Sequence, residues 1–419
     1  MGKRPSAASR SRLTGIVANR RRLAIVAGAM LGFVASMPVV LAYSTGVFVS
    51  AFEQAYGWSR ADTALCWSLY MLALFLGSTP AGRLADSLGA GRVATASMAV
   101  FGVSLILLPV VVHDLLSLWI AYALVSIAGL GTSPVVILKP VVAAFTARRG
   151  LAVAIAVCGA GGGAILVPVV ATALIDVGSW RLAYAGFGAV ALLVAPVLWL
   201  TQRVVPATPV TGRDGPVCQQ EPGVSLAEAS RLPRFWVLSA IALLTAAGVA
   251  GILVHLVPLL GDFGKSPREA AELAALLGVA SIAGRIGGGL LLDHISGPVV
   301  GVVLIGCCAI GLLLLAVLGA KGAVPGVLLI GCALGSELDL FAYFISRYFG
   351  LRAHSAIFGW NYSLMALAGM CSPYLLGVLY DWNGDYEFGL QLLSGIAAAG
   401  ALLCLALGPY RYGRSPDDR

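Results

Sequence analysis

Five ionisable side chains lie deep inside stretches of sequence that are otherwise apolar. They are Lys139, His255, Arg285, Glu337 and Asp339. If such a stretch crosses a bilayer, each charge within it costs at least roughly 2.5 kcal/mol on insertion scales, so charged residues there usually serve a function. These five residues are therefore the first candidates for binding an ion or moving a proton.

Arg285 is the strongest of the five candidates. A guanidinium group donates two parallel hydrogen bonds to a carboxylate, and a dry site strengthens them. Arg285 lies four residues before Gly289, whereas the residue four before Gly82, in a related stretch of the chain, is Ser78. The arginine is therefore an addition to a repeated pattern. We predict that it holds the carboxylate of a small anion; the alternative is that a protein acid neutralises it and it never touches substrate.

Asp339 is the expected protein partner of Arg285. It lies eight residues before Arg347 at the end of its apolar stretch, and Arg285 is equally far from the end of its own. Asp339, Tyr343 and Arg347 share one helix face, and Glu337 points away from it. A buried carboxylate that loses its cation binds a proton more readily, so Asp339 or Glu337 could couple protons to anion movement. Plain charge neutralisation is the alternative.

The remaining candidates carry weaker signals. His255 could relay protons or line a cavity beside the kink that Pro258 permits, and a neutral core histidine is an equal alternative. Lys139 lies about five residues from the end of its stretch, near enough to snorkel to the interface, and charge pairing or proton coupling is its other reading. Further candidates for substrate contact are Tyr122, Tyr343, Asn361 and Tyr362.

The elements that must position these residues are membrane-spanning helices. The chain has 419 residues, 59% hydrophobic and 11% charged, and apolar runs of about twenty residues recur along it. They are apolar on every face, which excludes the alternating strands of a membrane barrel. We predict an all-α polytopic protein with twelve spans, at residues 23–50, 59–82, 92–112, 115–144, 150–174, 181–201, 235–262, 268–292, 299–318, 324–348, 355–379 and 388–409.

The positive charges lie mostly on one side of these spans. The two tails, the central linker and the loops on their side hold 20 Lys and Arg, whereas the opposite loops hold five. This bias is the positive-inside signature, so we expect both termini in the cytoplasm and the protein in the cell (inner) membrane. The net charge of +8 thus indicates orientation rather than nucleic-acid binding. We expect no cleavable signal segment, because the residues before the first span are polar.

The chain divides into two similar halves. A proline-rich, charged segment separates six spans from six, and "GRLAD" at the end of the second span is echoed by "GLLLD" at the end of the eighth. Repeated bundles place a substrate site near the midplane between them. The predicted divisions are an N-terminal tail, a six-helix bundle, a linker, a second six-helix bundle and a C-terminal tail, at 1–22, 23–201, 202–234, 235–409 and 410–419.

Two motifs resemble known transporter families. "GSTPAGRLADSLGAGR", with Gly82, Arg83, Asp86 and Arg92, is similar to the loop signature between spans 2 and 3 of the major facilitator superfamily. The resemblance implies twelve helices in two six-helix bundles, with this segment acting as a gating latch. Asp293 is its counterpart in the second half.

A second resemblance narrows the branch. "FTARRGLAVAIAVCGAGGG" resembles the signature at the start of span 5 in the monocarboxylate transporter family. Residues 46–64 and 344–359 are similar to its bacterial relatives, including the oxalate/formate antiporter-like branch. The resemblance implies that an arginine in span 8, here Arg285, holds the substrate anion; the acid that relatives place one turn earlier is replaced by Ser281.

Other chemistry finds little support in the residues. "GAGGGA" at 159–164 resembles a dinucleotide fingerprint but lies inside an apolar span without a preceding strand, so tight helix packing is the better interpretation. The four histidines are scattered, and no group has catalytic or metal-ligand spacing. We expect no enzyme activity, no cofactor and no metal.

The sequence therefore predicts a secondary transporter. Its expected substrate is a small organic anion, most simply a monocarboxylate, moved by alternating access with proton symport, by a monomer in the lipid bilayer. The alternatives are an organic anion exchanger, a proton-coupled exporter of amphipathic compounds and, from another class, a non-transporting membrane receptor.

Overall fold

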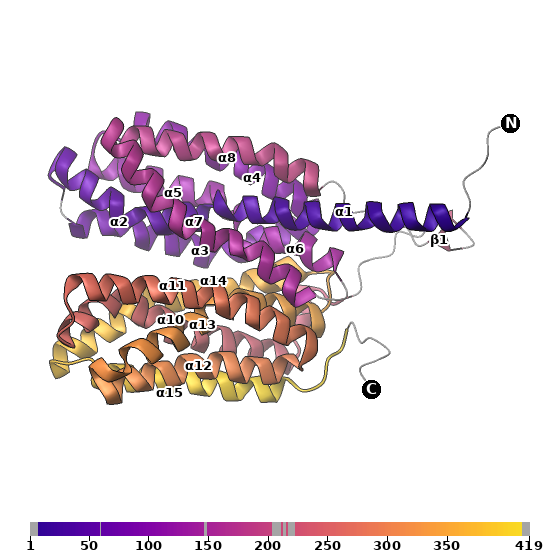
Figure 1. Ribbon diagram of the computed structural model, residues 1–419. Helices are drawn as coiled ribbons and strands as arrows, with labels where there is room; N and C mark the ends of the chain where they lie inside the picture. Colours follow the sequence, from indigo (N-terminus) through magenta and orange to yellow (C-terminus); the bar gives the residue numbers. More distant parts are fainter. Residues whose placement is uncertain are drawn as a thin grey trace.

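The computed structural model describes residues 7–58, 60–145, 149–202, 211–212, 215–216 and 223–412 of the chain. Figure 1 shows two groups of roughly parallel helices, one formed by the first half of the chain and the other by the second. The first and the last described residues lie at the same end of the molecule, hereafter the terminal end. The prediction of an all-α, polytopic architecture is confirmed, because the elements of the described part of the chain are helices apart from one pair of two-residue strands.

The long helices account for the predicted spans. The first group contains α1 (Ala7–Val34), α2 (Met37–Tyr56), α3 (Arg60–Leu88), α4 (Ala90–Val111), α5 (Leu115–Gly129), η1 (Leu130–Thr132), α6 (Pro134–Ala144), α7 (Arg149–Val177) and α8 (Trp180–Gln202). The second contains α10 (Pro233–Asp262), α11 (Pro267–His294), α12 (Gly297–Leu318), η2 (Gly319–Gly322), α13 (Ala323–Tyr348), α14 (His354–Asn383), α15 (Glu387–Leu403) and η3 (Cys404–Leu407). Between the groups lie β1 (Thr211–Gly212), β2 (Gly215–Pro216) and α9 (Leu226–Ala229).

Length and hydropathy identify eleven candidate membrane spans among the described residues. One of them, Gly297–Tyr348, is 52 residues long and contains both α12 and α13. A hydrocarbon core of about 30 Å takes roughly 20 helical residues, so this segment supplies two crossings. The helices thus provide twelve crossings, with α1 and α2 sharing one and α5 and α6 another.

Two of the predicted spans each consist of two helices instead of one. The 23–50 span is interrupted at Ala35 and Ser36, and the 115–144 span is interrupted at η1 and Ser133. At each break an extended serine precedes a helix with proline in its first turn, where the missing N–H is no loss. The breaks meet, because the backbone N–H of Met37 donates to Oγ1 of Thr132 at 2.9 Å.

The first helix begins before the first membrane span. Residues 7–22 belong to the predicted tail, and α1 is helical from Ala7, whereas the candidate membrane span begins at Arg20. Alanine and arginine favour helix, and no proline follows Pro5 until Pro38, so the helix extends back beyond the span without a break. In the predicted linker, Val224 N–H donates to the carbonyl of Phe349 at 3.0 Å, which fixes the linker's last residues to the second group.

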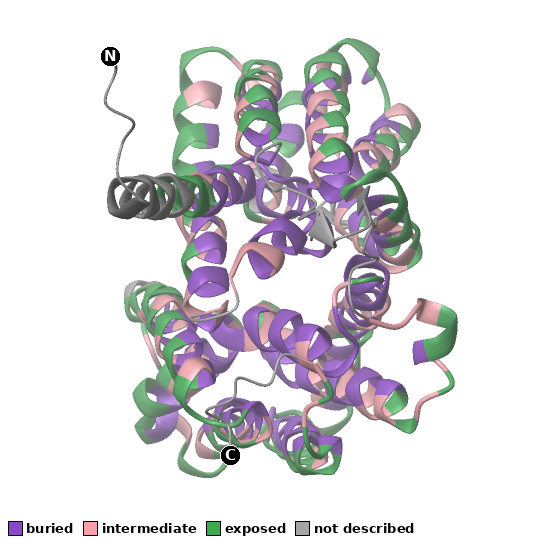
Figure 2. Ribbon diagram, turned by 90° about the vertical axis from the view of Figure 1, so that its right-hand side faces the viewer, coloured by how far each residue is buried: buried purple, intermediate pink, exposed green. Residues whose placement is uncertain are grey.

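The buried apolar residues form three clusters with different distributions. Figure 2, seen from the terminal end, shows buried ribbon toward the centre of the molecule and exposed ribbon at its periphery. One cluster is built almost wholly from the first group, and another lies wholly in the second. The largest cluster combines residues of both groups, including Val135 and Val153 from the first and Phe341 and Phe358 from the second.

Candidate functional site

An ion pair between α11 and α13 lies at the centre of the candidate site. Nη1 of Arg285 is 3.1 Å from Oδ1 of Asp339, and the two side chains are 11% and 0% exposed. The two helices approach closely because Gly284 packs on the carbonyl of Cys332 and Gly335 packs on that of Ser281. Two small residues therefore bring the arginine and the aspartate within hydrogen-bonding distance.

A second acid stands beside this pair. Glu337 is partly buried, and its Oε1 has no hydrogen-bond partner. Oδ2 of Asp339 is also buried without a partner. Glu337 interacts electrostatically with Arg285 and with Tyr362. One cation thus faces two carboxyl groups, two of whose oxygens still lack partners.

The first group of helices contributes the facing wall. Arg285 interacts electrostatically with Tyr43 on α2 and with Cys158 on α7. Tyr43 is 48% exposed, so part of this wall is accessible. Tyr70 and Tyr362 lie near Tyr43. The ion pair therefore lies between the two groups, beside phenolic hydroxyls that can donate to an anion.

Only some of the predicted contact residues accompany the ion pair. Tyr362 does so, through its interactions with Glu337 and Tyr43. Asn361 is fully buried, its Nδ2 donates to the carbonyl of Ile357 at 2.8 Å, and its Oδ1 has no partner. Tyr122 is 2% exposed within the first group's own apolar cluster, so almost none of its surface is accessible to a ligand.

His255 and Tyr343 are engaged elsewhere. The ring nitrogens of His255 contact Tyr386 Oη at 3.1 Å and the carbonyl of Pro373 at 2.9 Å, near the end opposite the termini. The hydroxyl of Tyr343 accepts from Nε of Arg347 at 3.1 Å, and its ring lies in the cluster shared by both groups. Asp339, Tyr343 and Arg347 were expected to act together on one helix face. Instead, Asp339 pairs with Arg285 on α11, and Tyr343 pairs with Arg347.

Lys139 differs from the expected snorkelling side chain. It is 9% exposed, and its Nζ lies 3.0 Å from Oδ1 of Asp86. Asp86 stands on α3 in the "GRLAD" motif, so the lysine neutralises an acid of that motif and is not at the Arg285 site. The ammonium group of Lys139 does not extend to the membrane surface, because the carboxylate of Asp86 neutralises it inside the protein.

Both motif aspartates cap helices of the opposite group. Oδ1 and Oδ2 of Asp86 accept from the backbone N–H groups of Ser355 at 3.2 Å and Ala356 at 2.8 Å, at the start of α14. The carboxylate of Asp293 accepts from Gly150 at 2.9 Å and Leu151 at 3.2 Å, at the start of α7. Carboxylates at helix N-termini satisfy orphan donors and the helix dipole.

Close helix crossings accompany both caps. Gly82 packs on the carbonyl of Ser355, and Gly150 packs on the carbonyl of Gly289. Gly82 itself lies within α3, which continues to Leu88, so the motif is mostly helix rather than the loop that was expected. Its two arginines, Arg83 and Arg92, are exposed and form no ion pair among the described residues.

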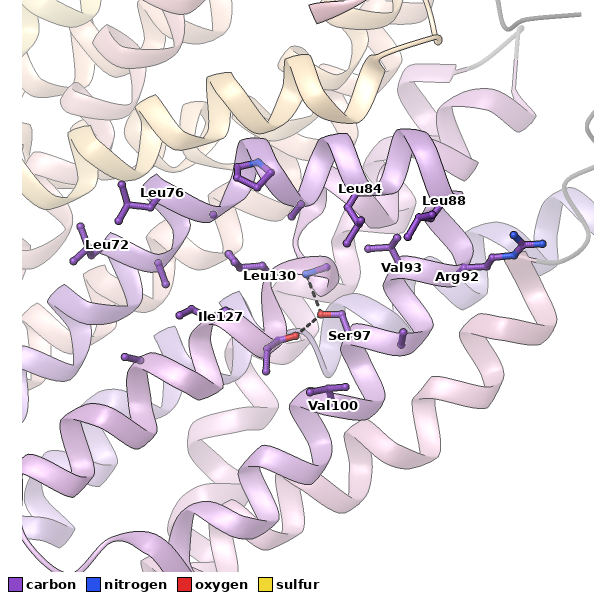
Figure 3. Close-up of a pocket in the computed structure, with 18 of the residues that line it drawn as sticks. Leu72, Leu76, Leu84, Leu88, Arg92, Val93, Ser97, Val100, Ile127 and Leu130 are labelled. Atoms are coloured by element: carbon purple, nitrogen blue, oxygen red, sulfur yellow. Dashed lines mark hydrogen bonds between the residues drawn. The ribbon is translucent and has the colours of Figure 1, made fainter.

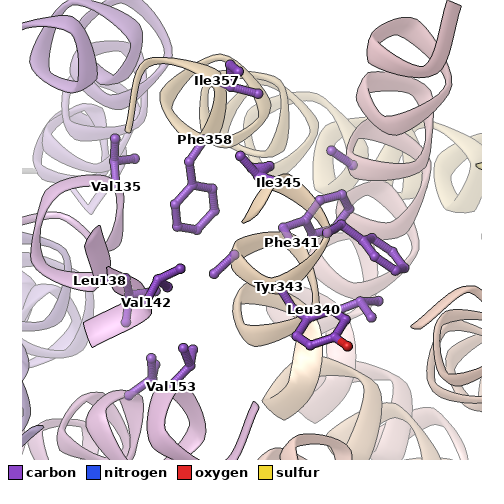
Figure 4. Packing of buried hydrophobic residues seen from close by; sticks show 14 of the residues in the cluster. Val135, Leu138, Val142, Val153, Leu340, Phe341, Tyr343, Ile345, Ile357 and Phe358 are labelled. Atoms are coloured by element: carbon purple, nitrogen blue, oxygen red, sulfur yellow. The ribbon is translucent and has the colours of Figure 1, made fainter. Parts of the chain in front are cut away.

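The apolar cluster shared by both groups lies at the same end as these caps. Figure 4 shows Val135, Val142 and Val153 of the first group opposite Phe341 and Phe358 of the second. Toward the other end the clusters separate by group. The molecule is therefore closed at the terminal end, and the Arg285 pair lies beyond this closure.

Sequence reasoning missed several of these partners. The N–H donors at the starts of α7 and α14, and the site neighbours Tyr43, Tyr70 and Cys158, were not predicted. The "GRLAD" and "GLLLD" echo marks the two aspartates but not what they bind. The donors are backbone groups, which leave no residue-type signal.

Comparison with known proteins identifies the family. The Major Facilitator Superfamily model matches residues 23–373. The chain belongs to the major facilitator superfamily. It is therefore a polytopic membrane transporter of that superfamily, and the resemblance seen in its motifs is confirmed.

Curated relatives of this superfamily member are moderately similar. It is 27% identical over 344 residues to the uncharacterized MFS-type transporter YhjX of Escherichia coli, covering 78% of this chain and 82% of that one. It is 28% identical over 290 residues to monocarboxylate transporter 12 of Mus musculus, covering 60% and 58% of the two chains. The match therefore spans only part of that mammalian protein.

Solved superfamily structures share the fold. The fucose:proton symporter FucP of E. coli has a TM-score of 0.73 at 14% identity, covering 92% of this chain and 98% of that one. The human organic anion transporter MFSD10 has a TM-score of 0.64 at 16% identity, covering 92% and 99%. At such identities the likeness establishes the twelve-helix fold alone.

Proposed function

We propose that this transporter carries a small organic anion, most simply a monocarboxylate, in symport with a proton. The observation that carries the proposal is the buried ion pair of Arg285 and Asp339 between the two helix groups. A neutral solute would give no reason to keep a desolvated guanidinium there, because burying a charge is costly even when it is paired. The 28% identity to monocarboxylate transporter 12 supports the same substrate class.

In the empty carrier Asp339 neutralises Arg285. An incoming carboxylate competes for the same guanidinium and can form two parallel hydrogen bonds with it. Displaced Asp339 is then a carboxylate in a desolvated site, and taking up a proton removes that cost. Substrate and proton would therefore enter together, and the loaded site has the same net charge as the empty one.

Glu337 is the second acid available for the proton. With Asp339 it gives two carboxyl groups against one guanidinium, so the site is most simply neutral when one acid holds a proton. Its Oε1 lacks a hydrogen-bond partner, which leaves it free to exchange that proton with a ligand or water. The proposal assigns proton coupling to these two residues and none to Lys139 or His255, whose contacts lie elsewhere.

Alternating access supplies the movement. We place the terminal end at the cytoplasm of the cell membrane, because the tails, linker and loops on that side carry 20 of the 27 Lys and Arg. The closed end would then face inward and the site would open outward. Transport requires the caps at Asp86 and Asp293 to release as the terminal end opens and the opposite end closes.

Uptake into proteoliposomes tests the anion site. Labelled mono- and dicarboxylates are supplied with an inward proton gradient, and Arg285→Ala is compared with the parent and with Arg21→Ala, an exposed cation on α1. Hydrogen bonds to charged groups contribute about 1.5–3 kcal/mol, so we expect apparent affinity to fall about 10- to 150-fold in Arg285→Ala alone. Unchanged transport of every accepted acid by Arg285→Ala would refute the anion site.

Proton coupling is tested separately. In Asp339→Asn and Glu337→Gln we expect net uptake to lose its dependence on the proton gradient in at least one variant, while exchange across the membrane continues. Uptake by the parent that needs trans substrate and ignores the gradient would instead identify an anion exchanger. Efflux of amphipathic compounds without acid uptake would identify an exporter, and binding without flux a receptor.

A further inference from the structure

A lateral groove runs along the outside of the first helix group. It has a volume of about 970 Å³ and is lined by α3, α4 and α5. That volume is at the upper end of the roughly 300–1,000 Å³ usual for ligand sites. Figure 3 shows leucines of α3 along one wall and Ser97 and Val100 of α4 along another. The groove is on the opposite face of α3 from the caps and lies outside the Arg285 site.

Small residues and internal hydrogen bonds shape this groove. Gly77 packs on Leu130, and Gly131 packs on Ser97, so the helices meet at the base with little side chain between them. The hydroxyl of Ser97 donates to the carbonyl of Ala128 and accepts from the N–H of Gly131. The polar groups at the base are therefore satisfied by one another, and the interior of the groove is apolar.

The rim consists of large exposed apolar side chains. Leu76 is 62% exposed, Leu88 54% and Ile127 57%. In a membrane protein these side chains contact acyl chains, which suits a groove open to lipid rather than to water. An occupant must therefore be apolar along most of its length.

One end of the groove carries a charge. Arg92 is the charged residue in the lining, and in Figure 3 its guanidinium points out beyond Leu88 toward the terminal end. Arg92 is exposed and forms no ion pair among the described residues. On α4 the lining extends from Arg92 to Val100, a rise of about 12 Å, which is close to half of a hydrocarbon core of roughly 30 Å.

We propose that this groove binds an anionic phospholipid of the leaflet at the terminal end. The phosphate lies at Arg92, and one acyl chain occupies the apolar channel between α3, α4 and α5. Charge complementarity selects an anionic headgroup, because the zwitterionic alternatives carry a compensating cation. Basic residues near a membrane surface gain about 1 kcal/mol each from anionic lipid. The inference does not depend on which solute is transported.

Lipid binding to the delipidated full-length protein in detergent tests the proposal. Dioleoyl phosphatidylglycerol and dioleoyl phosphatidylcholine are titrated separately, and bound lipid is counted by native mass spectrometry alongside thermal melting. We expect the parent to bind the anionic lipid about fivefold more tightly than the zwitterionic lipid. Glycerol phosphate without acyl chains should leave the melting temperature unchanged, since the channel is apolar.

Two pairs of variants test the contribution of the lipid headgroup and that of the acyl chain separately. Arg92→Gln should abolish the fivefold preference, while Arg21→Gln, an exposed arginine outside the groove, should retain it. Ala96→Phe should fill the channel and reduce binding of both lipids, while Ala189→Phe on exposed α8 should not. Equal losses in Arg92→Gln and Arg21→Gln would overturn the proposal, as would unchanged binding in a folded Ala96→Phe.

Discussion

At the scale of single residues, the burial of Arg285 depends on its ion pair with Asp339. Its guanidinium and the carboxylate of Asp339 are almost fully buried, and together they cost less than either would alone. Depth along the helices indicated Asp339, because both residues lie eight positions from a span end. Helix periodicity also separated it from Glu337, since a shift of two residues along a helix changes the face by about 200°.

Removing one member of the pair should destabilise the protein more than removing both. Asp339→Asn removes the carboxylate that is hydrogen-bonded to the buried guanidinium, and breaking such a pair costs about 3–5 kcal/mol. In Arg285→Gln/Asp339→Asn neither charge remains, so we expect a smaller loss. Thermal melting in detergent compares the single variants with the double variant. Strictly additive losses would contradict a direct interaction.

At the scale of elements, the two broken helices of the first group depend on each other. Oγ1 of Thr132, beside the second break, accepts from the N–H of Met37 at the first break and donates to the carbonyl of Gly129. The hydropathy of the sequence could not reveal the breaks, because the chain stays apolar through both of them. Pro38 and Pro134 were signals, yet prolines also occur within continuous α3, α7 and α10.

Thr132→Val should weaken this junction. Valine keeps the shape but leaves the N–H of Met37 buried without a partner, at a cost of about 1–3 kcal/mol. Thr172→Val is the matched control, because the hydroxyl of Thr172 is exposed and bonds only within its own helix. The melting temperature should fall in the first variant and hold in the second. Equal melting temperatures would show that the junction hydrogen bond contributes nothing.

The crossing of α3 and α14 should be equally sensitive. A Cβ at Gly82 would collide with the backbone carbonyl of Ser355, whereas one at Gly287 meets nothing within 4 Å. Gly82→Ala should therefore push the two groups apart at the terminal end, at about 1–3 kcal/mol, and Gly287→Ala should not. Spin labels on exposed Ser87 and Ser296 report that separation. An unchanged distance distribution in Gly82→Ala would mean that the crossing tolerates the methyl group.

At the scale of the whole molecule, closure at the terminal end rests on contacts between the two groups. The shared apolar cluster, the Asp86 cap on α14 and the Asp293 cap on α7 all lie there. Lys139 adds its charge to the Asp86 cap at 3.0 Å. Opening must break the caps on both sides, which makes the closed arrangement cooperative.

Neutralising either cap should shift the balance between the two states. Asp86→Asn and Asp293→Asn keep the side-chain shape but lose the charge at a helix N-terminus, worth about 0.3–1 kcal/mol each. We expect the open-at-the-terminal-end population to rise about two- to fivefold per substitution, with a further rise in the double variant. The Ser87 and Ser296 labels measure it, and exposed Asp381→Asn is the control. A fall in that population would contradict the assignment of the caps.

The number of crossings, the charge asymmetry and the arginine of the eighth span could all be predicted from the amino-acid sequence. These features are local, because a bilayer requires about twenty apolar residues per helix whatever that helix packs against. The packing of the helices was needed to show that Lys139 pairs with Asp86, that two spans are broken and that the terminal end is closed. The Arg285 and Asp339 contact joins residues 54 apart, and the Asp86 cap joins residues 270 apart. Such contacts depend on how whole helices pack, and several of them use backbone N–H groups that every residue except proline possesses.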